Sequence, residues 1–140
     1  IAIPESYIPD LSIRMELYRR VANLRHSMEI KEFEEEICDR FGTPPLLVRH
    51  LISSVEIKDL CRALWIQKID RGQKGFVFSF YQETPPNPEK LISFVSQNMT
   101  RFVLRPNGQI LFLKTYEEED QMIEGVISVL RELCESVLEH

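Results

Sequence analysis

The segment EFEEEICDRFGTPP, residues 32–45, decides the fold of this chain. At roughly 100° per residue, the apolar side chains in and just before this segment gather on one side of a helix, which is the spacing of a buried stripe. They are Ile30, Phe33, Ile37 and Phe41. Four carboxylates gather on the other side, and they are Glu32, Glu35, Glu36 and Asp39. The segment therefore predicts an amphipathic helix with one buried apolar face and one solvent-exposed acidic face.

The residues after this helix predict how it ends and what the acidic face can do. Gly42 suits the left-handed position that follows a helix, and Thr43 with the two prolines after it is typical of the start of a new helix. Arg40 can pair with Glu36 one turn earlier, whereas like charges four residues apart cost an isolated helix about 0.2–0.5 kcal/mol per pair. The acidic face is either an ordinary solvated surface or a binding surface for a basic partner.

One further helix is expected before the acidic helix and one after it. Asp10 is a suitable N-cap for a helix that runs to about His26, and a short turn near Ser27 predicts that this helix pairs antiparallel with the acidic one. Its expected buried stripe is Ile13, Leu17, Val21 and Leu24, and its basic outer face is Arg14, Arg19, Arg20 and Arg25. The third helix, from about Pro45 to Leu64, carries Val48, Leu51, Ile52, Val55, Leu60 and Leu64.

The second half of the chain changes from helical spacing to the alternation of strands. Segments 66–70 and 76–81 flank a glycine-containing turn, and Phe76, Phe78 and Phe80 alternate on one strand face. Segments 102–105 and 110–115 bracket Asn107-Gly108, a strong hairpin signal. We therefore expect two β-hairpins.

One short and one long helix complete the prediction. Asn87 followed by Pro88 predicts the start of the short helix, with Leu91, Ile92, Phe94 and Val95 turned inward. The acidic run 117–120 opens the long one, where negative charge suits a helix N-terminus. Its expected buried stripe is Ile123, Val126, Leu130, Leu133 and Val137. The fold class is α+β: three helices, a hairpin, a helix, a second hairpin, and a long C-terminal helix packed on a small antiparallel sheet.

Composition indicates an ordinary globular domain. The chain has 140 residues, 44% of them hydrophobic, and a formal net charge of −5. We expect a single domain over residues 1–137, with 138–140 as the remnant of an expression tag. The acidic balance argues against direct binding of nucleic acid or of an anionic membrane. No segment is long and apolar enough for a transmembrane helix, and the three widely spaced cysteines are typical of reduced thiols in a cytoplasmic protein.

Nothing in the sequence assembles a catalytic or metal site. His26 and His50 stand apart from any nucleophile motif, and the glycine turn 72–75 joins two predicted strands, whereas a phosphate loop joins a strand to a helix. No Cys/His spacing or acidic calcium loop is present. The domain is therefore predicted to be no enzyme and to need no cofactor or metal.

A nucleic-acid-binding domain is the alternative reading. Residues 33–54 have the layout of a helix-turn-helix, and the second helix offers Arg49, His50, Ser53 and Lys58. DNA binding needs several phosphate-neutralising cations, and the preceding helix is strongly acidic. A small hydrolase is a third, poorer possibility.

Two blocks of sequence resemble a known family. The first is Ile3-Pro4-x-x-Tyr7-Ile8-x-Asp10 with Arg14 and Leu17-Tyr18-Arg19-Arg20, and the second is Asp39-Arg40-Phe41-Gly42 followed by a proline. In this order and spacing they resemble the C-terminal domain of bacterial transcription-repair coupling factors, over almost the whole chain. Trp65 departs from the family pattern, in which Gly tends to precede the Ile.

The resemblance implies a regulatory function. Such factors are ATP-driven DNA translocases that displace stalled RNA polymerase and recruit nucleotide excision repair through a UvrB-like module that binds UvrA. The C-terminal domain folds over the UvrA-binding surface and keeps the factor autoinhibited. ATP and Mg²⁺ would belong to the motor domains of the parent. The residues expected to contact the UvrB-like module are Glu32, Glu35, Glu36, Asp39 and Arg40.

Overall fold

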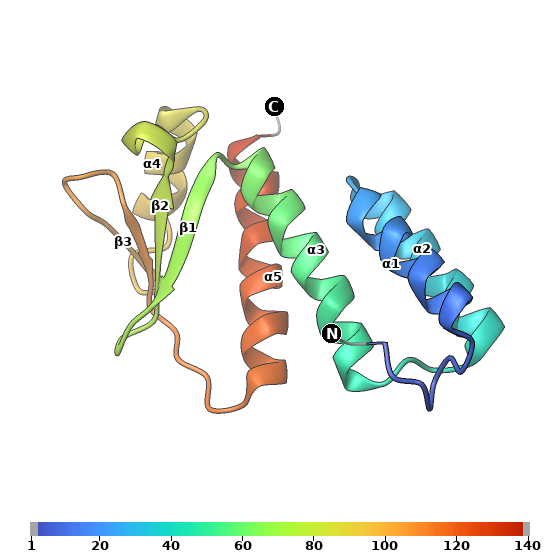
Figure 1. Cartoon of the computed structure of the whole chain (residues 1–140). Helices are drawn as coiled ribbons and strands as arrows, with labels where there is room; N and C mark the ends of the chain where they lie inside the picture. The colour runs from blue at the N-terminus through green and yellow to red at the C-terminus, as the bar shows by residue number, and fades with distance from the viewer. Residues whose placement is uncertain (1–2, 139–140) are drawn as a thin grey trace. The chain divides into compact units, whose positions relative to one another are not determined.

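A computed structural model describes residues 3–138, and within this range the predicted α+β order is confirmed (Figure 1). The helices are α1 (Leu11–Asn23), α2 (Ser27–Phe41), α3 (Leu46–Ala63), α4 (Pro88–Ser96) and α5 (Glu119–Val137), with a 3₁₀ turn η1 (Tyr81–Glu83). The strands are β1 (Ile66–Arg71), β2 (Phe76–Phe80), β3 (Phe102–Leu104) and β4 (Ile110–Phe112).

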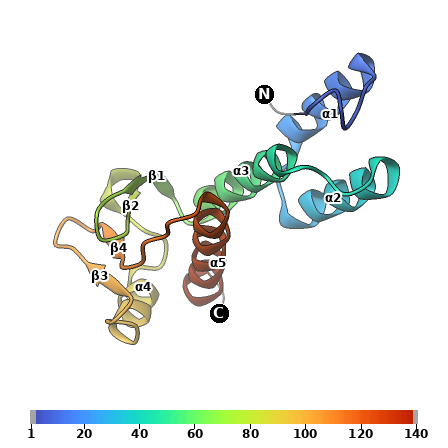
Figure 2. The same ribbon diagram turned by 90° about the horizontal axis from the view of Figure 1, so that it is seen from below.

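The internal contacts of the chain separate it into two compact units, Ile1–Asp59 and Leu60–His140. The first holds α1, α2 and most of α3, and the second holds the sheet, α4 and α5 (Figure 2). The expectation of one domain over residues 1–137 stays a prediction. Each unit is described below by itself.

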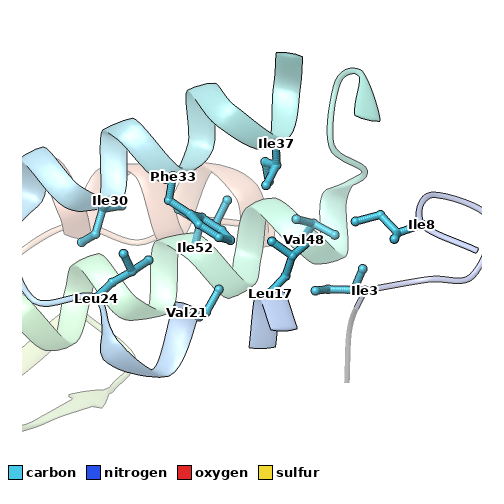
Figure 3. Close-up of a cluster of buried hydrophobic side chains, with 10 residues drawn as sticks. All are labelled: Ile3, Ile8, Leu17, Val21, Leu24, Ile30, Phe33, Ile37, Val48 and Ile52. Carbon is cyan, nitrogen blue, oxygen red and sulfur yellow. The ribbon is translucent and has the colours of Figure 1, made fainter. Parts of the chain in front are cut away.

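The first unit is built around the apolar face predicted for α2. Phe33 and Ile37 are each 2% exposed and turn into a cluster of ten buried side chains that also includes Leu17 of α1 and Val48 of α3 (Figure 3). Each large apolar side chain that is fully buried contributes roughly 1.5–3 kcal/mol to the stability of the folded unit. Asp10 caps α1 as predicted, because its Oδ1 accepts a hydrogen bond from the backbone N–H of Ser12 at 2.8 Å.

The second unit contains a four-stranded sheet in the order β1-β2-β4-β3, in which all neighbours are antiparallel. Both predicted hairpins are present, and the central pair joins β2 to β4, with Phe76 opposite Phe112 and Phe78 opposite Ile110. The face that carries Phe76, Phe78 and Phe80 is the buried one, since these side chains are at most 5% exposed. Phe94 of α4 packs edge-on against Phe102 at 5.3 Å between ring centres, which joins this helix to the sheet.

Polar contacts link α5 to two other segments of the second unit. Arg101, just before β3, donates from both terminal nitrogens to Glu132 of α5, at 2.9 and 2.6 Å. The side-chain amide of Asn87 donates to the carbonyl of Val137 at 2.8 Å. That bond satisfies one of the carbonyls that a helix C-terminus leaves without an intrahelical partner.

Several sequence expectations about the elements need correction. Helix α1 ends at Asn23 and not near His26, because Leu24 turns to extended backbone and enters the core at 8% exposure. Ile92 is 51% exposed, because the inward face of α4 is already filled by Leu91, Phe94 and Val95. Strand β4 ends at Phe112 and not at Thr115, because the backbone N–H of Lys114 bonds to the carbonyl of Phe112 and turns the chain.

Trp65 occupies a conformation that explains why Gly suits this position. It joins α3 to β1 with φ of 59°, in the left-handed region that costs a residue with a Cβ roughly 1–2 kcal/mol. Its carbonyl accepts a hydrogen bond from the N–H of Tyr81, and its side chain is 49% exposed. A residue with a Cβ therefore adopts the left-handed conformation at this turn.

Candidate docking surface

The two sequence blocks that carry the family resemblance meet in space within the first unit. The hydroxyl of Tyr7, from the first block, donates to the carbonyl of Gly42, from the second block, at 2.6 Å. The ring of Tyr7 also packs edge-on against Phe41, with 6.1 Å between ring centres. Gly42 itself adopts φ of 87°. The N-terminal segment therefore holds the C-terminal end of α2 in place.

Other residues of the first block also serve the fold of this unit. Arg14 Nη1 donates to the carbonyls of Ile8 and Pro9, at 2.8 and 2.9 Å. The backbone N–H of Ile3 donates to the hydroxyl of Tyr18 at 2.8 Å. Arg14 is thus turned toward the N-terminal segment, and Arg20 of the predicted basic face also has a specific partner, on α2.

Arg20 of α1 and Glu36 of α2 form an ion pair that joins these two helices. Arg20 Nη1 donates to Glu36 Oε2 at 2.6 Å, and Arg20 Nη2 donates to Glu36 Oε1 at 2.8 Å. This two-pronged geometry matches guanidinium to carboxylate and gives a charge-assisted pair. Each side chain is 37% exposed. The guanidinium carbon of Arg20 also lies 5.0 Å from the ring centre of Phe33.

Arg40 completes a three-residue cluster, defined here as the Arg20–Glu36–Arg40 triad. Arg40 Nη1 donates to Glu36 Oε2 at 3.1 Å, which is the predicted pairing one turn apart on α2. Its guanidinium carbon lies 4.8 Å from the ring centre of Phe41, and its side chain is 43% exposed. With two cations and one anion, the triad carries a net charge of about +1.

The triad explains the acidity of Glu36. Hydrogen bonds from Arg20, and secondarily from Arg40, lower the pKa of the Glu36 carboxyl from 4.5 to about 2, and partial desolvation opposes them. The same hydrogen bonds, which Arg20 donates to Glu36, raise the pKa of Arg20. Glu36 is consequently ionised and held at any pH near neutrality. The expectation that the whole acidic face is solvent-exposed is wrong for Glu36, because α1 partly covers it.

The remaining carboxylates of the predicted site behave differently. Glu32, Glu35 and Asp39 are exposed on α2, and no ion pair within residues 3–138 involves them. They form, with the triad beside them, a surface that is acidic in one part and basic in the other. Sequence reasoning placed the five residues on one helix correctly but missed Arg20. The contact could have been predicted from two features: Arg20 lies three residues after the buried Leu17, and its helix was expected to run antiparallel to α2.

The residues of the helix-turn-helix alternative lie on α3. Arg49 is exposed, whereas His50 and Ser53 are half-buried. His50 already has an interaction partner within the chain. His26 is exposed and stands at the N-terminus of α2.

The described residues offer no metal centre but do form a polar hollow. Within residues 3–138, no group of three or more His, Cys, Asp or Glu side chains is placed to hold a metal ion. A hollow of about 480 Å³ in the second unit is lined mainly by amide and hydroxyl groups with Lys68 and Glu83. Its serine, Ser79, accepts a hydrogen bond from the Gln109 amide at 3.0 Å. None of the helices described is both long and apolar enough to span a membrane.

Comparison with known proteins identifies the family of this domain. Fold and surface define a small α+β domain that exposes a charged helix face. The sequence profile of the TRCF domain matches residues 1–91. The chain therefore belongs to the TRCF domain family, as the resemblance predicted.

Relatives and a solved structure extend the match over nearly the whole chain. The transcription-repair-coupling factor of Rickettsia prowazekii is 36% identical over 124 residues, which is 89% of this chain and 11% of that protein. The factor of Escherichia coli K12 is 29% identical over 136 residues, 97% of this chain and 12% of that protein. A crystal structure of the C-terminal domain of transcription-repair coupling factor has the same fold, with a TM-score of 0.71 at 19% identity over 98% of this chain and 88% of that one. The chain thus spans only a small part of its full-length relatives.

Proposed function

We propose that this chain is the regulatory domain of a bacterial, cytoplasmic transcription-repair coupling factor. In this proposal the charged face of α2 docks onto the UvrB-like module of the same protein and masks its UvrA-binding surface. The parent protein would be an ATP-dependent DNA translocase that removes stalled RNA polymerase and recruits nucleotide excision repair. The proposal rests on membership in the TRCF domain family together with the geometry of α2.

The observation that carries the docking role is the exposed, unpaired part of the acidic face. Glu35 and Asp39 lie four residues apart on α2, and the like-charged pair is unfavourable for the isolated helix. A partner that presents arginine or lysine would turn this repulsion into attraction, and arginine forms especially good forked pairs with carboxylates. The face is therefore suited to a basic protein surface. We place the contact on the surface of α2 that carries Glu32, Glu35, Glu36, Asp39 and Arg40.

The domain itself would act by position and not by chemistry. In the closed state it would cover the surface that UvrA must reach, so the observed UvrA affinity falls with the fraction of open molecules. ATP and Mg²⁺ would be needed only by the motor part of the parent. Neither direct DNA contact nor membrane attachment is part of the proposed role.

The test is the UvrA affinity of the full-length parent protein. The triple change Glu32→Lys, Glu35→Lys, Asp39→Lys reverses the exposed carboxylates and leaves Glu36 untouched. We expect UvrA to bind the variant at least about tenfold more tightly than the wild type, because a change of about 1.4 kcal/mol in docking shifts the closed-to-open ratio tenfold.

A matched control keeps the same change in net charge elsewhere. Glu117→Lys, Glu118→Lys, Glu124→Lys alters three exposed carboxylates of the second unit. This control is expected to bind UvrA as the wild type does. Equal UvrA affinities for wild type, triple variant and control would overturn the docking role of α2, and an equal increase in both variants would reduce the effect to net charge.

A further inference from the structure

The carboxylate of Glu36 has little capacity left for a partner. An ionised carboxylate accepts about four hydrogen bonds, and three are already made: two from Arg20 and one from Arg40. An arginine of another surface could bind Glu36 through both prongs only after displacing Arg20. That exchange would break a 2.6 Å contact between α1 and α2 to make a similar one.

The Arg40 side chain, in contrast, is ordered by its neighbours and remains accessible to a partner. One of its terminal nitrogens donates to Glu36, its guanidinium carbon lies over the ring of Phe41, and 43% of its side chain is exposed. A long side chain loses substantial rotamer freedom when it is ordered, and this loss is already incurred before binding. Because the triad is net positive, the group that best complements its exposed end is a carboxylate.

We propose that Glu36 and Arg20 are positioning residues that hold Arg40, and that the docking partner presents a carboxylate to Arg40 beside the basic groups that meet Glu35 and Asp39. This inference rests on the proposed function and specifies the chemistry of its partner. The partner surface is then mixed in charge, and a uniformly basic surface would meet repulsion at the triad. Such mixed pairing fixes the register of docking as well as its strength.

The variant Arg20→Gln separates positioning from direct contact by the direction of its effect. If Glu36 itself met a basic partner group, removing Arg20 would free the carboxylate, strengthen docking and lower the UvrA affinity of the full-length parent. If Arg20 acts through Glu36 on Arg40, the same change loosens Arg40, weakens docking and raises UvrA affinity by about fivefold, the effect of one partly exposed charge contact.

A double-mutant cycle on UvrA affinity distinguishes positioning of Arg40 from a general structural role of Arg20. Arg40→Gln should raise UvrA affinity about fivefold alone, and adding Arg20→Gln on that background should add almost nothing, since the contact it supports is already gone. Ile30→Val, a change in the buried core of the same unit, is the control for lowered stability, and it should leave UvrA affinity at the wild-type value.

The outcomes are distinct from those of the docking test. If the Glu32/Glu35/Asp39 reversal leaves UvrA affinity unchanged, the proposed function fails. If that reversal opens the protein but Arg20→Gln lowers UvrA affinity, Glu36 is a direct contact and the positioning role is refuted. An unchanged UvrA affinity of Arg20→Gln would also refute the positioning role. Additive effects of Arg20→Gln and Arg40→Gln, or an effect of Ile30→Val as large as that of Arg20→Gln, would also overturn it.

Discussion

The Arg20–Glu36 pair makes a sharp prediction about stability and pH. The change Glu36→Gln keeps the shape of the side chain and removes its charge. A fall in the carboxyl pKa from 4.5 to about 2 corresponds to about 3 kcal/mol at roughly 1.4 kcal/mol for each pH unit, if it were realised in full. The side chain is 37% exposed, so solvent screening reduces this to about 1 kcal/mol of folding stability.

The sign of the pH dependence follows from the direction of the pKa change. Because the folded protein lowers the pKa of Glu36, its contribution is fully present above about pH 4.5 and is lost as the pH falls toward about 2. Urea unfolding of wild type and Glu36→Gln, measured from pH 7 down to pH 3, should show a difference of about 1 kcal/mol that shrinks only in the acid range.

The matched control is Glu35→Gln, which makes the same change in charge on the same helix at an exposed position. It should change the free energy of unfolding by no more than about 0.5 kcal/mol at any of these pH values. The reasoning is refuted if Glu36→Gln and Glu35→Gln are equally stable at pH 7, or if the loss caused by Glu36→Gln is the same at pH 7 and pH 3.

Three further predictions concern residues of the second unit, one of them in comparison with Cys38 of the first. Trp65→Gly should be about 1 kcal/mol more stable to urea than Trp65→Ala, because only alanine retains a Cβ at φ of 59°, and equal stabilities would show that the turn is unstrained. Gly75→Ala should destabilise by more than about 2 kcal/mol, since its Cβ would be placed 1.8 Å from the carbonyl oxygen of Phe112, and a near-native melting temperature would contradict this. Burial raises the pKa of the Cys61 thiol to about 11, so alkylation at mildly alkaline pH, followed by mass spectrometry, should label the exposed Cys38 first; faster labelling of Cys61 would show that its site is open.

Local patterns in the sequence predicted the elements better than they predicted the contacts between them. The spacing of Phe33 and Ile37 and the Asn107-Gly108 turn depend on neighbours in the chain, and both are found as predicted. The sheet order β1-β2-β4-β3 depends on β2 pairing with a strand about thirty residues away, which no local pattern specifies. The Arg20–Glu36 contact was missed for the same reason, because it requires knowing how two helices lie against each other.

Trp65, whose backbone is in the left-handed conformation, also provides an intrinsic fluorescence probe of unfolding. It is the only tryptophan among the 140 residues, and it lies at the junction of α3 and β1 in the second unit. Its emission on unfolding therefore follows the environment of that unit, whereas circular dichroism samples the helices of both. Emission and ellipticity recorded together on one unlabelled sample distinguish a single cooperative transition, in which the two curves coincide, from separate unfolding of the two units, in which they part.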